Sequence, residues 1–211
     1  GYINSILVLR FRIPSFIATL GGMWIYRGSM LALTGGETIP YTGDDIMFIA
    51  MSKQIGWFRP SHVWFIVMGL SFSFLLTRTT YGNWSLATGG SRETARALGI
   101  PVDRVKRINF MLCSMTASIA GMVVLTRFNI ANARFGLLTE LEAIASTVIG
   151  GTYLFGGYGT ILGCLLGTCI VGMMRIGLVM AGAPGYWYQS FVGATLVIAA
   201  IVNQRLRRAQ A

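Results

Sequence analysis

The sequence predicts an all-α membrane protein: a polytopic bundle of transmembrane helices with a coupling helix on the cytoplasmic side. Hydrophobic residues make up 54% of the 211 residues and charged residues only 11%. A soluble domain usually carries about 25% charged residues, so a bilayer is the better solvent for this chain. The apolar residues gather in long runs, and the 27 glycines suit close helix packing in lipid.

About six runs approach the roughly 20 apolar residues that a membrane-crossing helix needs. The predicted spans are residues 16–33, 62–77, 110–126, 141–154, 160–180 and 186–202. The run at 141–154 is about half to two-thirds of a full span, so we expect it to be short, tilted or re-entrant. The chain opens at Gly1 in a short apolar run, residues 2–9. We interpret this run as the end of a truncated helix and expect the N-terminal part of a longer protein to be missing.

The distribution of basic residues predicts the orientation, because Lys- and Arg-rich loops stay in the cytoplasm. If every span crosses, residues 10–12, 78–109, 150–159 and 203–211 lie inside. These segments hold eleven basic and two acidic residues, whereas the outside segments balance five against five. Membrane orientation therefore explains the formal charge of +10 better than nucleic-acid binding does. If 141–154 did not cross, three arginines of the tail would lie outside, so we favour a crossing.

The polar segment 78–109, called here the coupling segment, separates two long apolar runs. Ser91 can cap a helix over residues 92–98, and Glu93 in its first turn suits the helix dipole. Gly99 is a good left-handed terminator for this helix. A second helix begins at about residue 102. The apolar side chains that we expect to be available to a partner are Ala95, Leu98 and Ile100. From these residues alone, an ordinary amphipathic cytoplasmic loop is an equally good interpretation.

Two glycine patterns predict close approaches. Gly159, Gly163 and Gly167 recur every four residues, and we assign them to helix packing. The stretch GGTYLFGGYG, residues 150–159, predicts a turn that is either a tight connector or part of a gate.

Charged residues near the spans predict ion pairs, because charges at membrane depth are usually paired. A Glu142–Arg175 pair and a Glu140–Arg127 pair are both possible, with structural pairing favoured over substrate contact. Tyr188 is assigned to an aromatic belt at the membrane interface. No substrate-binding residue can be singled out.

The sequence contains no motif that predicts catalysis, so we expect a transport subunit and not an enzyme. It has no GxxxxGK[ST] phosphate loop, and its three cysteines show no metal-ligand spacing. We expect no catalytic residue, no metal and no cofactor bound by this chain. A secondary transporter or channel working without an ATPase is the alternative, but such proteins need acids within the membrane. Only Glu140 and Glu142 come near a span.

The stretch YGNWSLATGGSRETARALGIPVDRVK resembles the coupling loop of the binding-protein-dependent ABC importer permeases for simple sugars such as ribose, xylose, arabinose and galactose. That loop reads approximately G-x-x-x-x-A-x-G-G-N-x-x-A-A-x-x-x-G-I. The matching residues are Gly82, Ala87, Gly89, Gly90, Ala95, Gly99 and Ile100. Ser91 stands in place of Asn, and Thr94 in place of Ala.

Three further segments resemble the same family: residues 13–28, 140–167 and 176–200. Ser15 stands where Pro is common, and Met174-Arg175 stands near a usual pair of asparagines. The resemblance covers essentially the whole chain and corresponds to the C-terminal two-thirds of a permease.

The resemblance implies a membrane subunit of an importer in the bacterial inner (plasma) membrane. Its partners would be an ABC ATPase subunit that uses ATP and Mg, a second permease subunit, identical or not, and a periplasmic or extracellular sugar-binding protein. The residues that it assigns to ATPase coupling are Gly89, Gly90, Ser91, Glu93, Ala95, Arg96, Leu98, Gly99 and Ile100.

Overall fold

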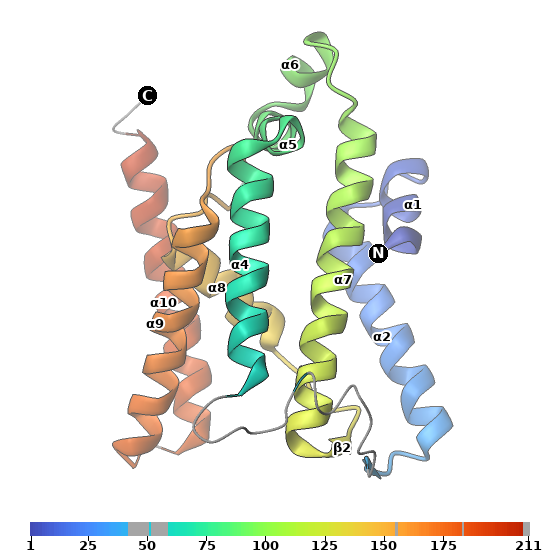
Figure 1. Cartoon of the computed structure of the whole chain (residues 1–211), viewed down its shortest axis with the longest axis vertical. Coiled ribbons are helices and arrows are strands. Elements are labelled where there is room, and N and C mark those ends of the chain that lie inside the picture. Colours follow the sequence, from blue (N-terminus) through green and yellow to red (C-terminus); the bar gives the residue numbers. More distant parts are fainter. Residues whose placement is uncertain (42–50, 52–58, 155, 183, 209–211) are drawn as a thin grey trace. The chain divides into compact units, whose positions relative to one another are not determined.

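The structure is a computed structural model that describes residues 1–41, 51, 59–154, 156–182 and 184–208. It is 77% helical with almost no strand, so the all-α prediction is confirmed. The chain divides into two compact units. Unit 1 comprises Gly1–Val67 and Pro101–Gly136, and unit 2 comprises Met68–Ile100 and Leu137–Ala211. Figure 1 shows the elements in chain order, and each unit is described by itself.

The described part of unit 1 includes three complete helices, the first part of a fourth and a pair of short strands. Its elements are α1 (Tyr2–Arg10), α2 (Ser15–Thr34), β1 (Ile39–Pro40), the first half of α4 (Pro60–Arg78), α7 (Val102–Phe128) and β2 (Ile130–Ala131). The N-terminal helix α1 contacts both α2 and α7. Both of these longer helices end at a left-handed residue, Gly35 after α2 and Asn129 after α7. Such a residue closes the last turn of a helix by donating its backbone N–H to a helix carbonyl.

The two strands follow α2 and α7 and pair with each other, which connects the C-terminal ends of these helices. They pair antiparallel, with Ile39 opposite Ala131 and Pro40 opposite Ile130. The amide of Asn132 donates to the Thr38 hydroxyl at 2.8 Å, and Arg27 Nε donates to a nearby backbone carbonyl at 3.1 Å. The polar residues of this region therefore stabilise the connection inside unit 1.

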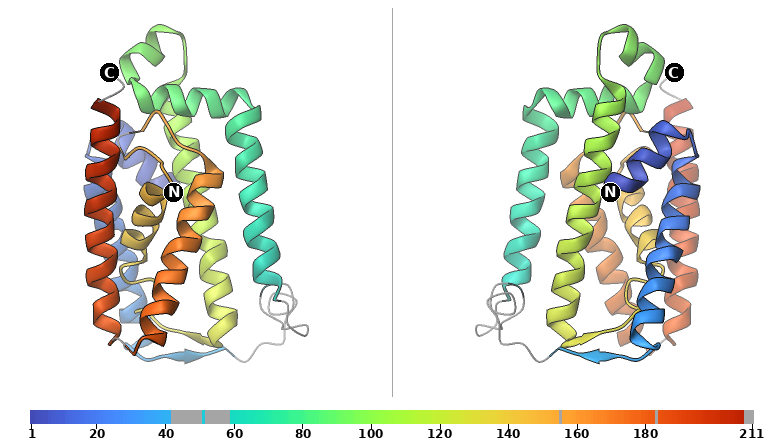
Figure 2. Two further views of the ribbon diagram at one scale, coloured as in Figure 1. Left: turned by 90° about the vertical axis from the view of Figure 1, so that its left-hand side faces the viewer. Right: turned by 90° about the vertical axis from the view of Figure 1, so that its right-hand side faces the viewer.

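Among its described residues, unit 2 holds the second half of α4 and five complete helices. These are α5 (Thr80–Gly90), α6 (Arg92–Ala97), α8 (Thr139–Ile149), α9 (Ile161–Met180) and α10 (Gly185–Arg208). The core of this unit is the packing of α8 against α9 and of α10 against both. Figure 2 shows α5 turning sharply away from the end of α4.

The length of α8 differs from a full span. The sequence predicts a span at 141–154, but the helix ends at Ile149, where Gly150 and Gly151 follow. Gly151 has a φ of +83°, a conformation that glycine adopts without strain. Eleven helical residues rise about 16 Å, roughly half the thickness of a hydrocarbon core. A crossing here would therefore also need residues 150–160.

Three of the described helices are long and apolar enough to cross a membrane, namely α4, α7 and α9. The helix α10 contains a shorter apolar stretch, Trp187–Ile201. At most 11% of the apolar window of each long helix is buried within the structure. Their side chains thus face outward, as expected of helices in contact with lipid or with neighbouring membrane helices.

Candidate functional site

The first helix of the coupling segment is α5. The hydroxyl of Thr79 accepts the backbone N–H of Gly82 at 3.2 Å and so caps its first turn. The sequence predicted a polar stretch that ends in Gly89-Gly90 and named no helix over these residues. The structure is helical through Gly90, although glycine disfavours helix interiors by about 1 kcal/mol. Burial raises the pKa of the Tyr81 phenol above its ordinary value.

The second helix, α6, begins and ends where the sequence predicted. Ser91 accepts the backbone N–H of Thr94 at 3.3 Å, which confirms the N-terminal cap. Gly99 has a φ of +78°, and the N–H of Ile100 reaches back to the carbonyl of Ala95 at 3.0 Å. These bonds satisfy carbonyls of the last turn and confirm the stop at Gly99. The result is a six-residue helix fixed at both ends.

The side chains of α6 differ in their accessibility. Leu98 is 73% exposed, and Glu93 and Arg96 are also exposed. Ile100 is half-buried. Ala95 is only 1% exposed, so the expectation that its side chain is available to a partner is wrong. A partner docking on α6 would meet Leu98 and the charged residues, whereas Ala95 would only hold the helix in place.

The end of α5 meets the turn before α9 backbone to backbone. We call this contact between Gly89-Gly90 and Gly156-Gly157 the glycine crossing. A Cβ atom added at Gly89 would lie 2.6 Å from the nitrogen of Gly157. One added at Gly157 would lie 2.8 Å from the Cα of Gly90. Real Cβ atoms essentially never come so close to backbone atoms. The two backbones can therefore approach this closely only because none of these four glycines has a side chain.

The same mode of packing continues from this turn into α8 and α9. A Cβ at Gly163 would collide with the Gly150 carbonyl, and one at Gly167 would collide with the Ser146 carbonyl. Gly163 and Gly167 lie in α9, whereas Gly159 precedes that helix and faces Thr152. The coupling segment is thus connected to α8 and α9 through a series of close backbone contacts within unit 2.

The remaining predicted polar contact lies at the other end of α8. Of the two ion pairs that the sequence allowed, the structure contains Glu142–Arg175, with 3.8 Å between nitrogen and oxygen. Arg127 stacks on the ring of its neighbour Phe128, 5.9 Å from the ring centroid. Among the described residues, no three His, Cys, Asp or Glu side chains are grouped so that they could hold a metal ion.

A family model described as the permease component of branched-chain amino acid transport systems matches residues 1–200. The chain belongs to this permease family. The predicted resemblance to a transport permease family is thereby confirmed. No solved structure matches the chain.

Similar proteins include three autoinducer 2 import system permease proteins, LsrC. The protein of Photorhabdus luminescens is 33% identical over 212 residues, which cover 98% of this chain and 62% of the relative. The protein of Klebsiella pneumoniae is 35% identical over 211 residues, which cover 100% of this chain and 61% of the relative. The protein of Yersinia pseudotuberculosis serotype IB is 34% identical over 98% of this chain and 59% of the relative. The chain thus spans about three-fifths of the length of these relatives.

Proposed function

We propose that this chain forms part of the membrane-spanning subunit of an ATP-driven importer that brings a small sugar-like molecule into a bacterial cell. The observation that carries the proposal is α6, a short helix capped at Ser91 and stopped at Gly99, with Leu98 73% exposed. An exposed apolar side chain beside charged ones on a fixed helix suits a docking protein. The chain contains no phosphate loop, so the docking partner would bring the nucleotide.

The proposed mechanism is mechanical, and this chain performs no covalent chemistry in it. An ATPase subunit would bind α6 and displace it when ATP closes the ATPase pair. Because Gly89 contacts Gly156 and Gly157 with no side chain between them, the displacement would pass directly to the turn before α9. The turn and α8 would then change position and open or close the path of the solute. A binding protein would deliver the solute on the outer side, and a second permease subunit would complete the path.

The substrate class rests on the family resemblance and on the named relatives. The relatives are named as importers of autoinducer 2, a sugar-like molecule. The family description names branched-chain amino acids instead. We favour a sugar-like solute, with autoinducer 2 as one candidate, because the relatives match nearly the whole chain.

A secondary transporter that needs no ATPase is the second candidate. It is favoured by the Glu142–Arg175 pair, because ion-coupled transporters use charged groups within their helices. The two functions differ in one requirement, since only the importer depends on ATP and on an ATPase that binds α6.

The test uses the full-length permease purified with its genomic partners from membranes. We expect an ABC ATPase to co-purify and the reconstituted complex to take up solute only with ATP. Radiolabelled D-ribose, D-xylose, D-galactose, autoinducer 2 and L-leucine would identify the substrate class. Uptake that continues without ATP would favour the secondary transporter.

The matched pair Leu98→Asp and Leu98→Met tests the docking surface. A carboxylate at this exposed position should prevent ATPase binding and reduce uptake at least tenfold. Methionine keeps a similar apolar volume and should leave both unchanged. Normal ATPase binding and normal uptake by the Leu98→Asp variant would refute docking on α6.

A further inference from the structure

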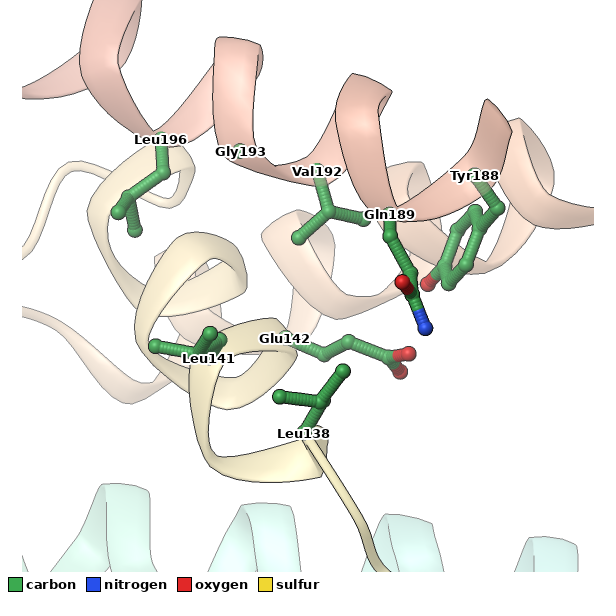
Figure 3. A pocket seen from close by; sticks show the side chains of 8 residues that line it. All are labelled: Leu138, Leu141, Glu142, Tyr188, Gln189, Val192, Gly193 and Leu196. Carbon is green, nitrogen blue, oxygen red and sulfur yellow. The ribbon is translucent and has the colours of Figure 1, made fainter. Parts of the chain in front are cut away.

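A small cavity lies at the N-terminal end of α8, between this helix and α10 (Figure 3). Its walls are mostly apolar and come from Leu138, Leu141, Val192 and Leu196. Three polar side chains, those of Glu142, Tyr188 and Gln189, also line it. Figure 3 shows these three pointing into the same space. Apolar walls with a few convergent polar groups are the usual composition of a small-molecule site.

A fourth polar group, Arg175 of α9, reaches the same cluster. Its guanidinium lies 3.8 Å from the carboxylate of Glu142 and 5.2 Å from the centroid of the Tyr188 ring. A charge-assisted hydrogen bond is usually 2.7–2.9 Å long, so this pair is a loose one. The guanidinium has five N–H donors, which is more than this single contact can use. The pair therefore retains hydrogen-bonding capacity for a third partner.

Structural stabilisation alone is a poor explanation for the pair. The side chain of Arg175 is 63% exposed and that of Glu142 is 27% exposed. An ion pair with so much exposure contributes little to stability. Glu142 nevertheless lies in the first turn of α8, within the predicted span 141–154. Arg175 lies about 7.5 Å before the end of α9, which is long and apolar enough to cross a membrane. Charged groups at such positions are costly to keep, which indicates a function beyond packing.

The position of the cavity in the fold also indicates a solute site. The helix α8 is only about half a span long, and the cavity lies beside its N-terminal end. In membrane transporters, half-length helices characteristically end at the bound solute, since their free backbone groups face a cavity.

We propose that Glu142, Arg175, Tyr188 and Gln189 form a contact site for the hydroxyl groups of the transported solute. The inference rests on the proposed importer function and deepens it. Hydroxyl groups both donate and accept hydrogen bonds. The carboxylate of Glu142 would accept from them, and Arg175 and Gln189 would donate to them. The Tyr188 ring and the leucines would cover the C–H face of the solute.

The size and the charge of the site both favour a neutral polyol. The cavity has a volume of about 80 Å³, room for a few water-sized groups, so it would hold one edge of a small sugar. Glu142 and Arg175 already neutralise each other. A neutral solute can bind without separating Glu142 from Arg175. A zwitterionic amino acid would pair its own charged groups with these two side chains and would have to separate them.

The experiment compares Glu142→Gln with Glu140→Gln in the full-length permease, reconstituted with its ATPase and binding protein. Both residues lie in the first turn of α8, so both variants remove a carboxylate that interacts favourably with the helix dipole. Residues two apart on a helix do not share a face, which makes Glu140→Gln the matched control. The five radiolabelled solutes named above serve as probes. We expect Glu142→Gln to raise the KM for the transported sugar-like solute at least tenfold and Glu140→Gln to leave it unchanged.

The double variant Glu142→Arg with Arg175→Glu separates solute contact from structural pairing. It keeps an ion pair but exchanges donor and acceptor, so uptake should stay low while complex assembly is normal. Recovery of uptake in the double variant would assign the pair to structure and overturn the proposal. So would equal KM values for the two single variants, or a KM effect seen with L-leucine and not with a sugar. Failure of the ATPase to co-purify with the wild type would instead refute the importer function itself.

Discussion

Two contact regions of unit 2 differ in the groups that meet there: backbones at the glycine crossing and long side chains at the cavity. At the glycine crossing, two backbones meet without side chains, and an added Cβ atom at Gly89 would come within 2.6 Å of a backbone nitrogen. At the cavity, long side chains such as Glu142 and Arg175 meet at 3.8 Å and keep open space beside them. A contact between backbones transmits position and tolerates no added volume, because backbone atoms cannot rotate out of the way. A contact between flexible side chains can adjust to a solute.

This difference gives each region a distinct sensitivity to mutation. Transport should be sensitive to added side-chain volume at the glycine crossing. At the cavity it should be sensitive to the chemistry of the polar groups. The contrast between Glu142→Gln and Glu140→Gln tests the second statement. Substitutions of the glycines and of Thr88 test the first statement.

The largest effect is expected for Gly89→Ala, with Gly90→Ala as its matched control. Both glycines are the last residues of α5, and helix propensity alone would favour alanine at either position by about 1 kcal/mol. The added Cβ at Gly89 would collide with Gly157, whereas the one at Gly90 would lie 3.8 Å from the nearest atom, an ordinary contact. We expect Gly89→Ala to lower uptake at least tenfold and Gly90→Ala to stay near wild type. Uptake assays on the reconstituted complex measure both.

If the two alanine variants behaved alike, the backbone contact would not matter for transport. ATP hydrolysis should be measured on the same samples. Loss of uptake with continued ATP hydrolysis would indicate that the glycine crossing couples ATP hydrolysis to uptake. Parallel loss of both would indicate a defect in assembly.

A smaller effect is expected within the packing of α8 on α9. Gly167→Ala places a Cβ against the carbonyl of Ser146 and within 2.8 Å of the Gly150 nitrogen, whereas Gly172→Ala meets nothing within 4 Å. Overpacking of this kind costs about 1–3 kcal/mol. The first variant should therefore lower the thermal unfolding temperature of the purified permease, and the second should leave it nearly unchanged. Equal unfolding temperatures would show that α8 and α9 can move apart at little cost.

Local signals in the sequence were sufficient to predict the local structure. Ser91 and Gly99 set the ends of α6 because capping bonds span only three to five residues. The short apolar run at 141–154 likewise predicted a helix of less than full length, although the glycines end it at Ile149. The Glu142–Arg175 pair was one of two alternatives, since charge cost alone does not choose between partners.

Contacts between distant segments could not be predicted in the same way. Gly89 and Gly157 are far apart in the chain, and their doubled glycines only indicated flexible sequence. No helix was predicted over Thr80–Gly90, where the hydroxyl of Thr79 caps α5. Tyr188 was assigned to an interfacial belt, and only the packing of α10 on α8 places it beside Glu142. Tertiary packing, and not propensity, decides these features.

The smallest effect is expected for Thr88→Val, next to the crossing. Thr88 is 7% exposed, and its hydroxyl oxygen has no hydrogen-bond partner in the described part of the chain. A buried hydroxyl without a partner is unfavourable by about 1–3 kcal/mol, and valine has nearly the same volume. The variant should therefore be at least as stable as the wild type and transport normally, because it changes chemistry and not volume. Thr126→Val is the control, since that equally buried hydroxyl donates to the Met122 carbonyl at 2.9 Å. The free energy of unfolding of the Thr126→Val variant should be lower by about 0.5–1.5 kcal/mol, as measured by thermal unfolding. A loss of uptake by Thr88→Val would show that the crossing depends on polar chemistry as well as on volume, and the contrast with the cavity would then fail.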